Sequence, residues 1–599
     1  MHPLELPALQ PLDGEPGRLR PRTRLRRPAE RRRRGRPGVD RRRPRRPGTP
    51  QLDRSRPPRP RGDGPALRPP PPRTRDHHPP RPSRGPPLVN EHVTHAAGSD
   101  RAERPNILLV VSDEERRTDW LADHADLPAH ERLAAEGLTF RRHFTHTSPC
   151  SPSRASLYTG LYLHQHGVVD NVSFPTHTAL DPALPTLGHL LRGAGYRTAY
   201  LGKWHLSHSN TPDMEAHGYA DWTGDDVHYT GSAWSGRHFD PLICDQAVSW
   251  LADHADDTTP WFLTVALVNP HDIMWFPIDQ PDHLAAHPAD REIFDAIRRL
   301  RLGDLELEPP PPIERRFDRL PDNFDDDLHT KPEVQRAWRH VRNTEHFVGR
   351  IDPGDTEMWL RQLDYYAWLH EHLDVSLGRL LDAVDRQGLA DDTVVVYTSD
   401  HGDACGAHGL RAKLPCVYEE VMGVPLVVRA PGRATPGSVT DALSTHVDLA
   451  ATICALAGVD PAGAGLPGAD LGPVLDDPSA SVREAVFFAQ DSAQSELIRN
   501  CRYAVRGFFD GTTKYARYYG IGGGIRRDGT PDPEPKLFGP DAAFDECDHE
   551  WYQLDDDPGE LRNRAVERAF RHETRELFAR LLALEYAELG EAAGHDGTP

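Results

Sequence analysis

The chain has 599 residues, enough for one large domain and a smaller one, and no stretch approaches the roughly 18 consecutive apolar residues of a membrane span. The net charge of −20 divides unevenly, because residues 1–100 carry a net charge of +15 and the other 499 residues carry −35. The strongly negative charge of these 499 residues argues against nucleic-acid binding by the folded part of the chain. An anionic substrate would need a few well-placed cationic side chains. Since the start of the chain lacks the apolar stretch of a secretory signal, we expect a cytoplasmic protein that does not bind membranes.

The first hundred residues contain 23 Pro and 25 Arg and cannot form an apolar face. We predict that residues 1–100 are disordered. A basic arm of this kind could bind nucleic acid or an anionic membrane. It could also be an artefact of a misplaced start, with Val89 or Val93 at the true start, because the next methionine after Met1 is Met214. The N-terminal mass of the native protein would decide between these interpretations.

From Asn106 the sequence alternates between short apolar runs and segments of helical pattern. The apolar run 106–111 ends in Ser112-Asp113-Glu114, which is typical of a buried parallel strand with acids at its carboxyl end. Further strands are predicted at 197–201, 261–268, 393–398 and 425–428, and helices at 185–193, 360–387 and 445–457. This alternation predicts a doubly wound α/β domain over residues 104–484.

Two regions depart from this alternation. Residues 275–355 are rich in Pro, Arg and Asp, and we interpret them as a long loop-like insertion that shapes access to the site. Residues 485–599 begin with short aromatic runs and end with a helical pattern over 565–590. We predict a smaller C-terminal subdomain there, made of an antiparallel sheet and a packed helix.

The seven cysteines are odd in number and include no C-x-x-C pair, so neither a disulfide framework nor a structural zinc site is expected. Six of them are interpreted as buried thiols. Cys150 differs because it begins Cys150-Ser151-Pro152-Ser153-Arg154, in which Ser151 and Pro152 suit the N-cap and first position of a helix. Cys150 would then lie at a helix mouth that favours anions, although an incidental buried cysteine at a helix start would look the same.

The longer segment Cys150–Gly160 closely resembles the first signature of the sulfatase family, in which C-x-P-x-R directs oxidation of the cysteine to formylglycine. Gly195–His205, which ends in Gly202-Lys203-Trp204-His205, is similar to the second signature. Asp400-His401-Gly402-Asp403, followed by Lys413, resembles the late metal and lysine segment, and Asn269-Pro270-His271 resembles the segment that bears an active-site histidine. The chain is thus identified as a sulfatase-like member of the alkaline phosphatase superfamily, with resemblance from about 104 to 567.

The resemblance implies a metal site and a set of catalytic residues. The implied metal ligands are Asp113, Glu114, Asp400, His401 and an oxygen on the modified Cys150. An oxygen-rich set suits Ca²⁺, with Mg²⁺ or Mn²⁺ as alternatives. The sequence departs from the commonest pattern at Glu114, where the family usually has a second Asp, and Glu would reach the same ion with a longer side chain.

The implied mechanism uses the hydrated aldehyde of residue 150 as nucleophile on sulfur, helped by Arg154 and the cation. Lys203 and Lys413 would hold the sulfate oxygens, and His271 would protonate the departing oxygen. His205 would then take a proton from the second hydroxyl and release sulfate.

Two other functions compete with a sulfuric ester hydrolase that acts on a small-molecule sulfate ester. A phosphonate monoester or phosphodiester hydrolase of the same superfamily would use the same site, and the Glu at 114 slightly favours it. A non-catalytic binding protein is disfavoured because the set of functional residues is otherwise complete. The resemblance also implies a formylglycine-generating enzyme as a partner, whereas the sequence leaves the particular ester and the oligomeric state open.

Overall fold

The computed structural model describes residues 104–173, 175–344, 348–492, 498, 501–522 and 536–590. The basic segment 1–100, for which disorder was predicted, lies outside the described residues.

A seven-stranded mixed sheet forms the centre of the main domain, in the order β4-β5-β1-β6-β7-β2-β8. Strands β4, β5, β1 and β6 are parallel, whereas β7 runs antiparallel to β6, and β2 antiparallel to β7. The sheet contains all five predicted strands, so the α/β prediction is confirmed. The strands span Asn106–Asp113 (β1), Leu138–Phe140 (β2), Arg197–Gly202 (β4), Trp261–Pro270 (β5), Thr393–Ser399 (β6), Leu426–Arg429 (β7) and Ser438–Thr440 (β8).

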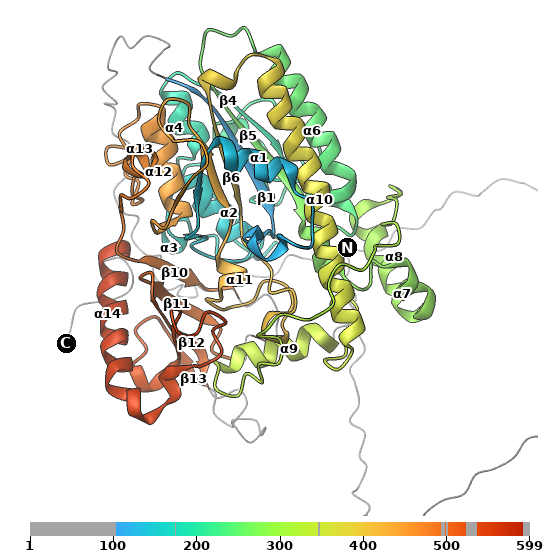
Figure 1. Ribbon diagram of the computed structural model, residues 1–599, viewed down its shortest axis with the longest axis vertical. Coiled ribbons are helices and arrows are strands. Elements are labelled where there is room, and N and C mark those ends of the chain that lie inside the picture. The colour runs from blue at the N-terminus through green and yellow to red at the C-terminus, as the bar shows by residue number, and fades with distance from the viewer. Residues whose placement is uncertain are drawn as a thin grey trace, which may run out of the picture. The chain divides into compact units, whose positions relative to one another are not determined.

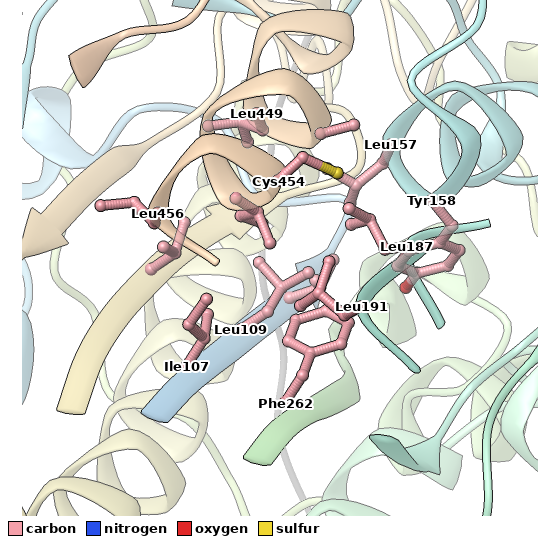
Figure 2. Packing of buried hydrophobic residues seen from close by; sticks show 14 of the residues in the cluster. Ile107, Leu109, Leu157, Tyr158, Leu187, Leu191, Phe262, Leu449, Cys454 and Leu456 are labelled. Carbon is pink, nitrogen blue, oxygen red and sulfur yellow. The ribbon is translucent and has the colours of Figure 1, made fainter. Parts of the chain in front are cut away.

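Helices cover both faces of this sheet because successive side chains of a strand point to opposite sides (Figure 1). On β1, Ile107 and Leu109 pack with α2, α4 and α12, and Figure 2 shows them against leucines of these helices. Leu108 and Val110 face α1, α6 and α10 on the other side. The helices span Pro128–Glu136 (α1), Cys150–Thr159 (α2), Leu187–Gly193 (α4), Ser235–Asp253 (α6), Thr356–Arg386 (α10) and His446–Leu456 (α12).

Burial on both faces explains why β1 is almost entirely apolar. Its residues from Ile107 to Val111 have no exposed surface. Each such side chain contributes about 1.5–3 kcal/mol by leaving water. The polar residues Ser112 and Asp113 come only at the end of the strand, so the same strand that anchors the core delivers an acid to the edge of the sheet.

The carboxyl ends of the four parallel strands bring four sequence-distant segments together. Ser112 of β1 is in register with Ser399 of β6, so Asp113 and Asp400 leave neighbouring strands at the same edge. β4 ends at Gly202 and β5 at Pro270, directly before Lys203 and His271. This edge is where open α/β sheets place their binding sites.

The insertion 275–355 is more ordered than the predicted loop, because it contains three helices. Their bounds are Pro281–Ala286 (α7), Pro288–Leu302 (α8) and Glu333–Thr344 (α9). In α9, Val334, Trp338 and Val341 follow an i, i+4, i+7 spacing and are buried in one apolar cluster. The abundance of Pro, Arg and Asp hid this spacing in the sequence.

The C-terminal part forms a second, antiparallel sheet with one long helix beside it (Figure 1). The predicted sheet and helix are confirmed, and the structure adds β12, which pairs with β11, β13 and β14. The elements span Val486–Gln490 (β10), Ala504–Phe509 (β11), Thr513–Gly522 (β12), Lys536–Phe538 (β13), Asp548–Gln553 (β14) and Arg571–Leu589 (α14).

All seven cysteines are buried and unpaired, as expected for a chain without a disulfide framework. Among the helices of the described residues, none combines the length and apolar character that crossing a membrane requires.

Candidate active site

Cys150 is the first residue of α2 and is completely buried. The helix therefore begins two residues earlier than predicted, and its N-cap is Pro149 rather than Ser151. The reason is that the Ser151 hydroxyl is used elsewhere: it donates to the His205 carbonyl oxygen at 2.6 Å and accepts from the Val172 amide at 3.1 Å. Ser151 thus ties the start of α2 to the segment that carries His205.

Arg154, one turn further along α2, bridges the two strand-end carboxylates. Its Nη2 donates to Asp113 Oδ2 at 2.6 Å and its Nε to Asp400 Oδ2 at 2.9 Å, while Nη1 donates to the Lys203 carbonyl oxygen at 3.0 Å. All these side chains are buried. A buried guanidinium needs such charged partners, since an unpaired one would cost several kcal/mol.

The remaining oxygen of each carboxylate faces Cys150 and His401. Cys150 Sγ lies 4.0 Å from Asp113 Oδ1 and 3.3 Å from His401 Nε2, and that nitrogen lies 3.7 Å from Asp400 Oδ1. Ligand atoms of these four residues all lie within 4.8 Å of one another. His401 Nδ1 is 2.9 Å from the Gly402 carbonyl oxygen, so Nδ1 donates and Nε2 keeps a lone pair for an ion.

Glu114 belongs to a second group, with Asp113 and His271, rather than to the group around Cys150. Its Oε2 accepts from Lys413 Nζ at 2.8 Å, while its buried Oε1 has no hydrogen-bond partner. Burial raises the pKa of Glu114 well above its ordinary value and outweighs the opposing charge of Lys413. A partnerless carboxylate oxygen beside Asp113 fits an additional ligand for a cation, so Glu114 as a metal ligand stays a prediction.

Positive charges surround Asp113. Lys203 Nζ lies 2.5 Å from Asp113 Oδ2. Burial alone would raise the pKa of Asp113, but the charges of Lys203 and Arg154 hold it well below the ordinary value. Asp113 is therefore ionised at neutral pH. Cys150 shows the opposite shift, because burial and the Asp113 charge raise the pKa of its thiol, which makes the unmodified thiol a poor nucleophile.

The two candidate proton-transfer histidines follow β4 and β5, so both come from the same edge of the sheet. His271 Nε2 is 3.9 Å from Asp113 Oδ1 and 3.7 Å from Glu114 Oε2. Burial, reinforced by nearby lysines, lowers the pKa of both His205 and His271 well below the ordinary value. Both imidazoles are thus neutral, and in both the buried Nδ1 has no hydrogen-bond partner.

Several supporting residues were not found from the sequence. Asp226 accepts hydrogen bonds from the Trp204 amide at 2.9 Å and from the His205 amide at 2.9 Å, which holds His205 in a left-handed conformation with φ of 57°. Gly231 lies against the His271 ring, and a Cβ there would be 2.1 Å from Nδ1. Their roles depend on tertiary contacts, so neither lies in a recognisable motif.

The insertion contacts this site through backbone groups. Arg411, two residues before Lys413, donates from Nη2 to the Phe276 carbonyl oxygen at 2.7 Å and from Nη1 to the Gly349 carbonyl oxygen at 3.2 Å. Trp275 Nε1 donates to the Gly231 carbonyl oxygen at 2.8 Å. The insertion is therefore fastened to the segments that carry Lys413 and Gly231, and its role in access to the site stays a prediction.

A buried group of carboxylates, a histidine and a cysteine lies at the carboxyl ends of parallel strands, flanked by two lysines and an arginine. This arrangement is that of an α/β hydrolase for an anionic ester. The Sulfatase family profile matches residues 105–459, and the C-terminal profile of N-sulphoglucosamine sulphohydrolase matches residues 406–519. The first match covers more than half of the chain, so the chain belongs to the sulfatase family and is a sulfuric ester hydrolase.

Known proteins agree with this assignment. The N-acetylglucosamine-6-O-sulfatase of Bacteroides thetaiotaomicron is 28% identical over 453 residues, which cover 68% of this chain and 78% of the relative. A protein solved with its substrate D-glucosamine-2-N,6-O-disulfate has the same fold, with a TM-score of 0.59 and 21% identity over 82% of this chain and all of that chain. The phosphonate monoester hydrolase of Agrobacterium radiobacter also shares the fold, with a TM-score of 0.57 and 21% identity over 81% of this chain and 96% of that one.

Proposed function

We propose that the protein hydrolyses a small-molecule sulfate ester with a formylglycine made from Cys150, next to a bound Ca²⁺ ion. The observation that carries the proposal is the convergence of Cys150 with Asp113, Asp400 and His401 at one edge of the sheet. A raised thiol pKa makes the unmodified cysteine a weak nucleophile, so conversion to an aldehyde gives the position a function. A formylglycine-generating enzyme of the host would carry out the conversion.

The residues present fit a divalent cation. Arg154 takes only Oδ2 of Asp113 and of Asp400. Asp113 Oδ1 and His401 Nε2 lie beside Cys150 Sγ, and Asp400 Oδ1, which also accepts from the Glu114 and His401 amides, belongs to the same group. Two carboxylates and one imidazole form an oxygen-rich set that favours Ca²⁺ over Zn²⁺, and Glu114 Oε1 would add a further oxygen. When bound, the cation supplies positive charge beside the sulfate, and the hydrated aldehyde supplies an oxygen nucleophile.

The chain's own cationic side chains would bind the sulfate. Lys203 and Arg154 lie on one side of Asp113, and Lys413 lies beside Glu114, so three fixed positive charges face the position where the ester oxygens would sit. Their charges are held in a buried site, where they stabilise developing negative charge more strongly than in water. We assign Lys203 and Lys413 to hold the sulfate oxygens. Arg154, whose donors are taken by Asp113, Asp400 and the Lys203 carbonyl oxygen, is assigned to help the nucleophile.

The two neutral histidines would move protons. His271 lies within 4 Å of both Asp113 and Glu114, and we assign it to protonating the departing oxygen, for which it must first gain a proton. Burial lowers the pKa of His205, so its imidazole is neutral at neutral pH. A neutral imidazole can accept a proton, so we assign His205 to the step that releases sulfate.

The first test is the mass of the peptide that contains Cys150, taken from protein purified from its own host. Formylglycine lowers the mass by about 18 Da relative to the thiol. Active protein with an unmodified Cys150 would overturn the mechanism.

The second test removes metal with a chelator and restores activity with Ca²⁺, Mg²⁺ or Mn²⁺ in turn. Recovery with Mg²⁺ alone would exclude the assignment of calcium.

A matched pair of substrates tests the reaction class. We expect faster release of sulfate from an aryl sulfate than cleavage of the corresponding aryl phosphodiester, and glucosamine 6-sulfate extends the panel toward the sugar sulfates named for relatives. If protein that contains the aldehyde cleaves the diester faster, the protein is instead a phosphonate monoester or phosphodiester hydrolase. A phosphonate monoester hydrolase has the same fold as this chain.

A further inference from the structure

Three potential metal ligands meet at the corner between α7 and α8, in the insertion and apart from the residues of the candidate active site. His283 lies in α7, His287 between the two helices and Asp290 in the first turn of α8 (Figure 1). One ligand atom from each of the three lies within 4.8 Å of the other two. The spacing His-x₃-His-x₂-Asp therefore becomes a compact cluster only because the chain turns at residue 287.

The buried half of this cluster is a histidine with an unused nitrogen. His283 Nε2 lies 2.8 Å from Asp290 Oδ2, and the two side chains are only 5% and 10% exposed. The other ring nitrogen, Nδ1, is buried and has no hydrogen-bond partner. Burial lowers the pKa of His283. A buried imidazole against a carboxylate is half of a metal site.

His287 supplies the exposed half. Its ring stacks on that of His283, with centroids 4.2 Å apart. Its Nδ1 lies 3.0 Å from the His283 carbonyl oxygen, so Nδ1 donates there and Nε2 keeps its lone pair. Histidine ligands of metals are usually oriented by such a bond to a backbone carbonyl. Since the side chain is exposed, an ion can enter from solvent.

We propose that His283, His287 and Asp290 bind a divalent transition-metal ion of the zinc class, with water completing the coordination. Two imidazoles and one carboxylate suit Zn²⁺, Ni²⁺ or Co²⁺ better than Ca²⁺ or Mg²⁺. The ion would sit between His283 Nε2 and Asp290 Oδ2, and the imidazole proton would move to Nδ1. The two ligand atoms would move apart from 2.8 Å to the roughly 3.3 Å that two bonds of about 2.0 Å require. This site rests on the geometry of the insertion and is independent of the proposed sulfatase chemistry.

The packing of α7 and α8 shows what this ion would stabilise. Leu284 of α7 and Phe294 of α8 are buried with Trp234 and Trp275, and the rings of Trp234 and Phe294 lie 5.1 Å apart. Trp275 in turn donates to the carbonyl oxygen of Gly231, the residue packed on His271. A metal at the α7–α8 corner therefore braces the helices that support the His271 side of the active site.

Zinc binding by the metal-stripped full chain tests the proposal. Calcium is kept in excess during the titration to compete for the active site, and Zn²⁺ binding is followed by calorimetry. We expect His287→Ala and His283→Gln to lose one zinc equivalent, or to bind it at least tenfold more weakly. The thermal unfolding midpoint should rise with Zn²⁺ in the unchanged chain but not in His287→Ala.

Two control variants separate this site from other effects. His254 is matched to His287, because it also follows a helix and its Nδ1 lies 2.8 Å from the carbonyl oxygen four residues earlier. His254→Ala should keep the zinc equivalent. Asp400→Asn should keep it as well, since this residue lies in the active-site group. Equal zinc binding by His287→Ala and the unchanged chain, or no zinc equivalent at all beside calcium, would overturn the proposal.

Discussion

The active site and the junction between the two sheets both bury charged side chains, but they arrange them differently. At the junction, Lys514 of β12 lies between Glu419 and Glu560, with Nζ 2.5 Å from Glu419 Oε1 and 2.9 Å from Glu560 Oε1. The second oxygen of Glu560 accepts from the Glu419 amide at 2.9 Å. This junction cluster thus contains its own cation and joins the C-terminal sheet to the main domain.

The active site contains a bridging cation as well, yet Arg154 uses one oxygen of each carboxylate only. The other oxygens converge with His401 and Cys150, and partnerless atoms remain on Glu114, His205 and His271. Buried charges that neutralise one another hold a fold together, whereas buried lone pairs that converge indicate a place for a ligand. The predictions below test this distinction.

The largest effect is expected at Cys150. Cys150→Ala should lower kcat by about 10³-fold or more, because it removes the nucleophile, while the free energy of unfolding changes little. Cys454 is a matched buried cysteine in the apolar core on α12, and Cys454→Ala should do the reverse, costing about 1–2 kcal/mol of stability with kcat kept. Steady-state rates and urea unfolding measure both. Substantial activity in Cys150→Ala would show that the group around Cys150 is not the catalytic site.

The next largest effect is on stability at the junction cluster. Lys514→Met should destabilise the protein by about 3–5 kcal/mol, because it leaves the buried Glu560 without its cation, whereas Glu419 keeps its ion pair with Arg117. Urea unfolding measures the loss, and kcat of the folded protein should stay within about twofold. Adding Glu560→Gln to this variant should recover part of the stability. A loss below about 1 kcal/mol would show that the cluster is not structural.

A pH-dependent effect is expected from His130, a third buried network. Its Nδ1 lies 2.6 Å from Asp374 Oδ1 and its Nε2 3.2 Å from Glu115 Oε1. Burial would lower the pKa of His130, but the two carboxylates outweigh it and raise the pKa to about 9. Protonated His130 therefore adds about 3 kcal/mol to the free energy of unfolding. This contribution is fully present below about pH 6.5 and is lost as the pH rises through about 9.

Urea unfolding between pH 6 and pH 9.5 measures this loss. His130→Gln carries no titrating group, so its stability should vary less with pH over the same range. Parallel pH profiles of the variant and the unchanged chain would contradict the assignment.

The smallest effect is expected at Asp226, which positions His205 through the backbone. Asp226→Asn keeps the size of the side chain but weakens the bonds to the Trp204 and His205 amides. We expect kcat to fall about tenfold with little change in KM, since the proton-transfer histidine loses its orientation. The neighbour Asp225 caps α5 (Asp226–Tyr229), and Asp225→Asn is the control that should leave kcat unchanged. If the two variants have equal kinetics, Asp226 does not position His205 for catalysis.

The sequence predicted the strands of the main sheet and the residues that cluster at its edge, because both depend on local patterns. The apolar runs mark strands buried on both faces, and Cys150, Arg154, Lys203 and His271 lie in short motifs directly after strands or at a helix start. Parallel strands bring their carboxyl ends together, so the order of the segments already implied their proximity.

Features that depend on approach between distant segments were not predictable. Asp226 accepts from amides 21 and 22 residues earlier, and nothing in its own neighbourhood marks this contact. The start of α2 was placed two residues late because the hydroxyl of Ser151 is taken by the His205 carbonyl oxygen, a tertiary contact. Helices α7, α8 and α9 escaped notice because their apolar positions are few and lie among many charged residues.

The left-handed backbone of Glu114, with φ of 68°, has a consequence for which residues this position can tolerate. Asp, Asn and Gly adopt this conformation more readily than Glu, which pays about 1–2 kcal/mol for it. Only Glu, however, combines a carboxylate with an arm long enough to contact Lys413 as it does here. Replacing Glu114 with Asp would lower the conformational cost of the backbone, but the shorter side chain would not reach Lys413. The backbone conformation therefore favours Asp at this position, whereas the contact with Lys413 favours Glu.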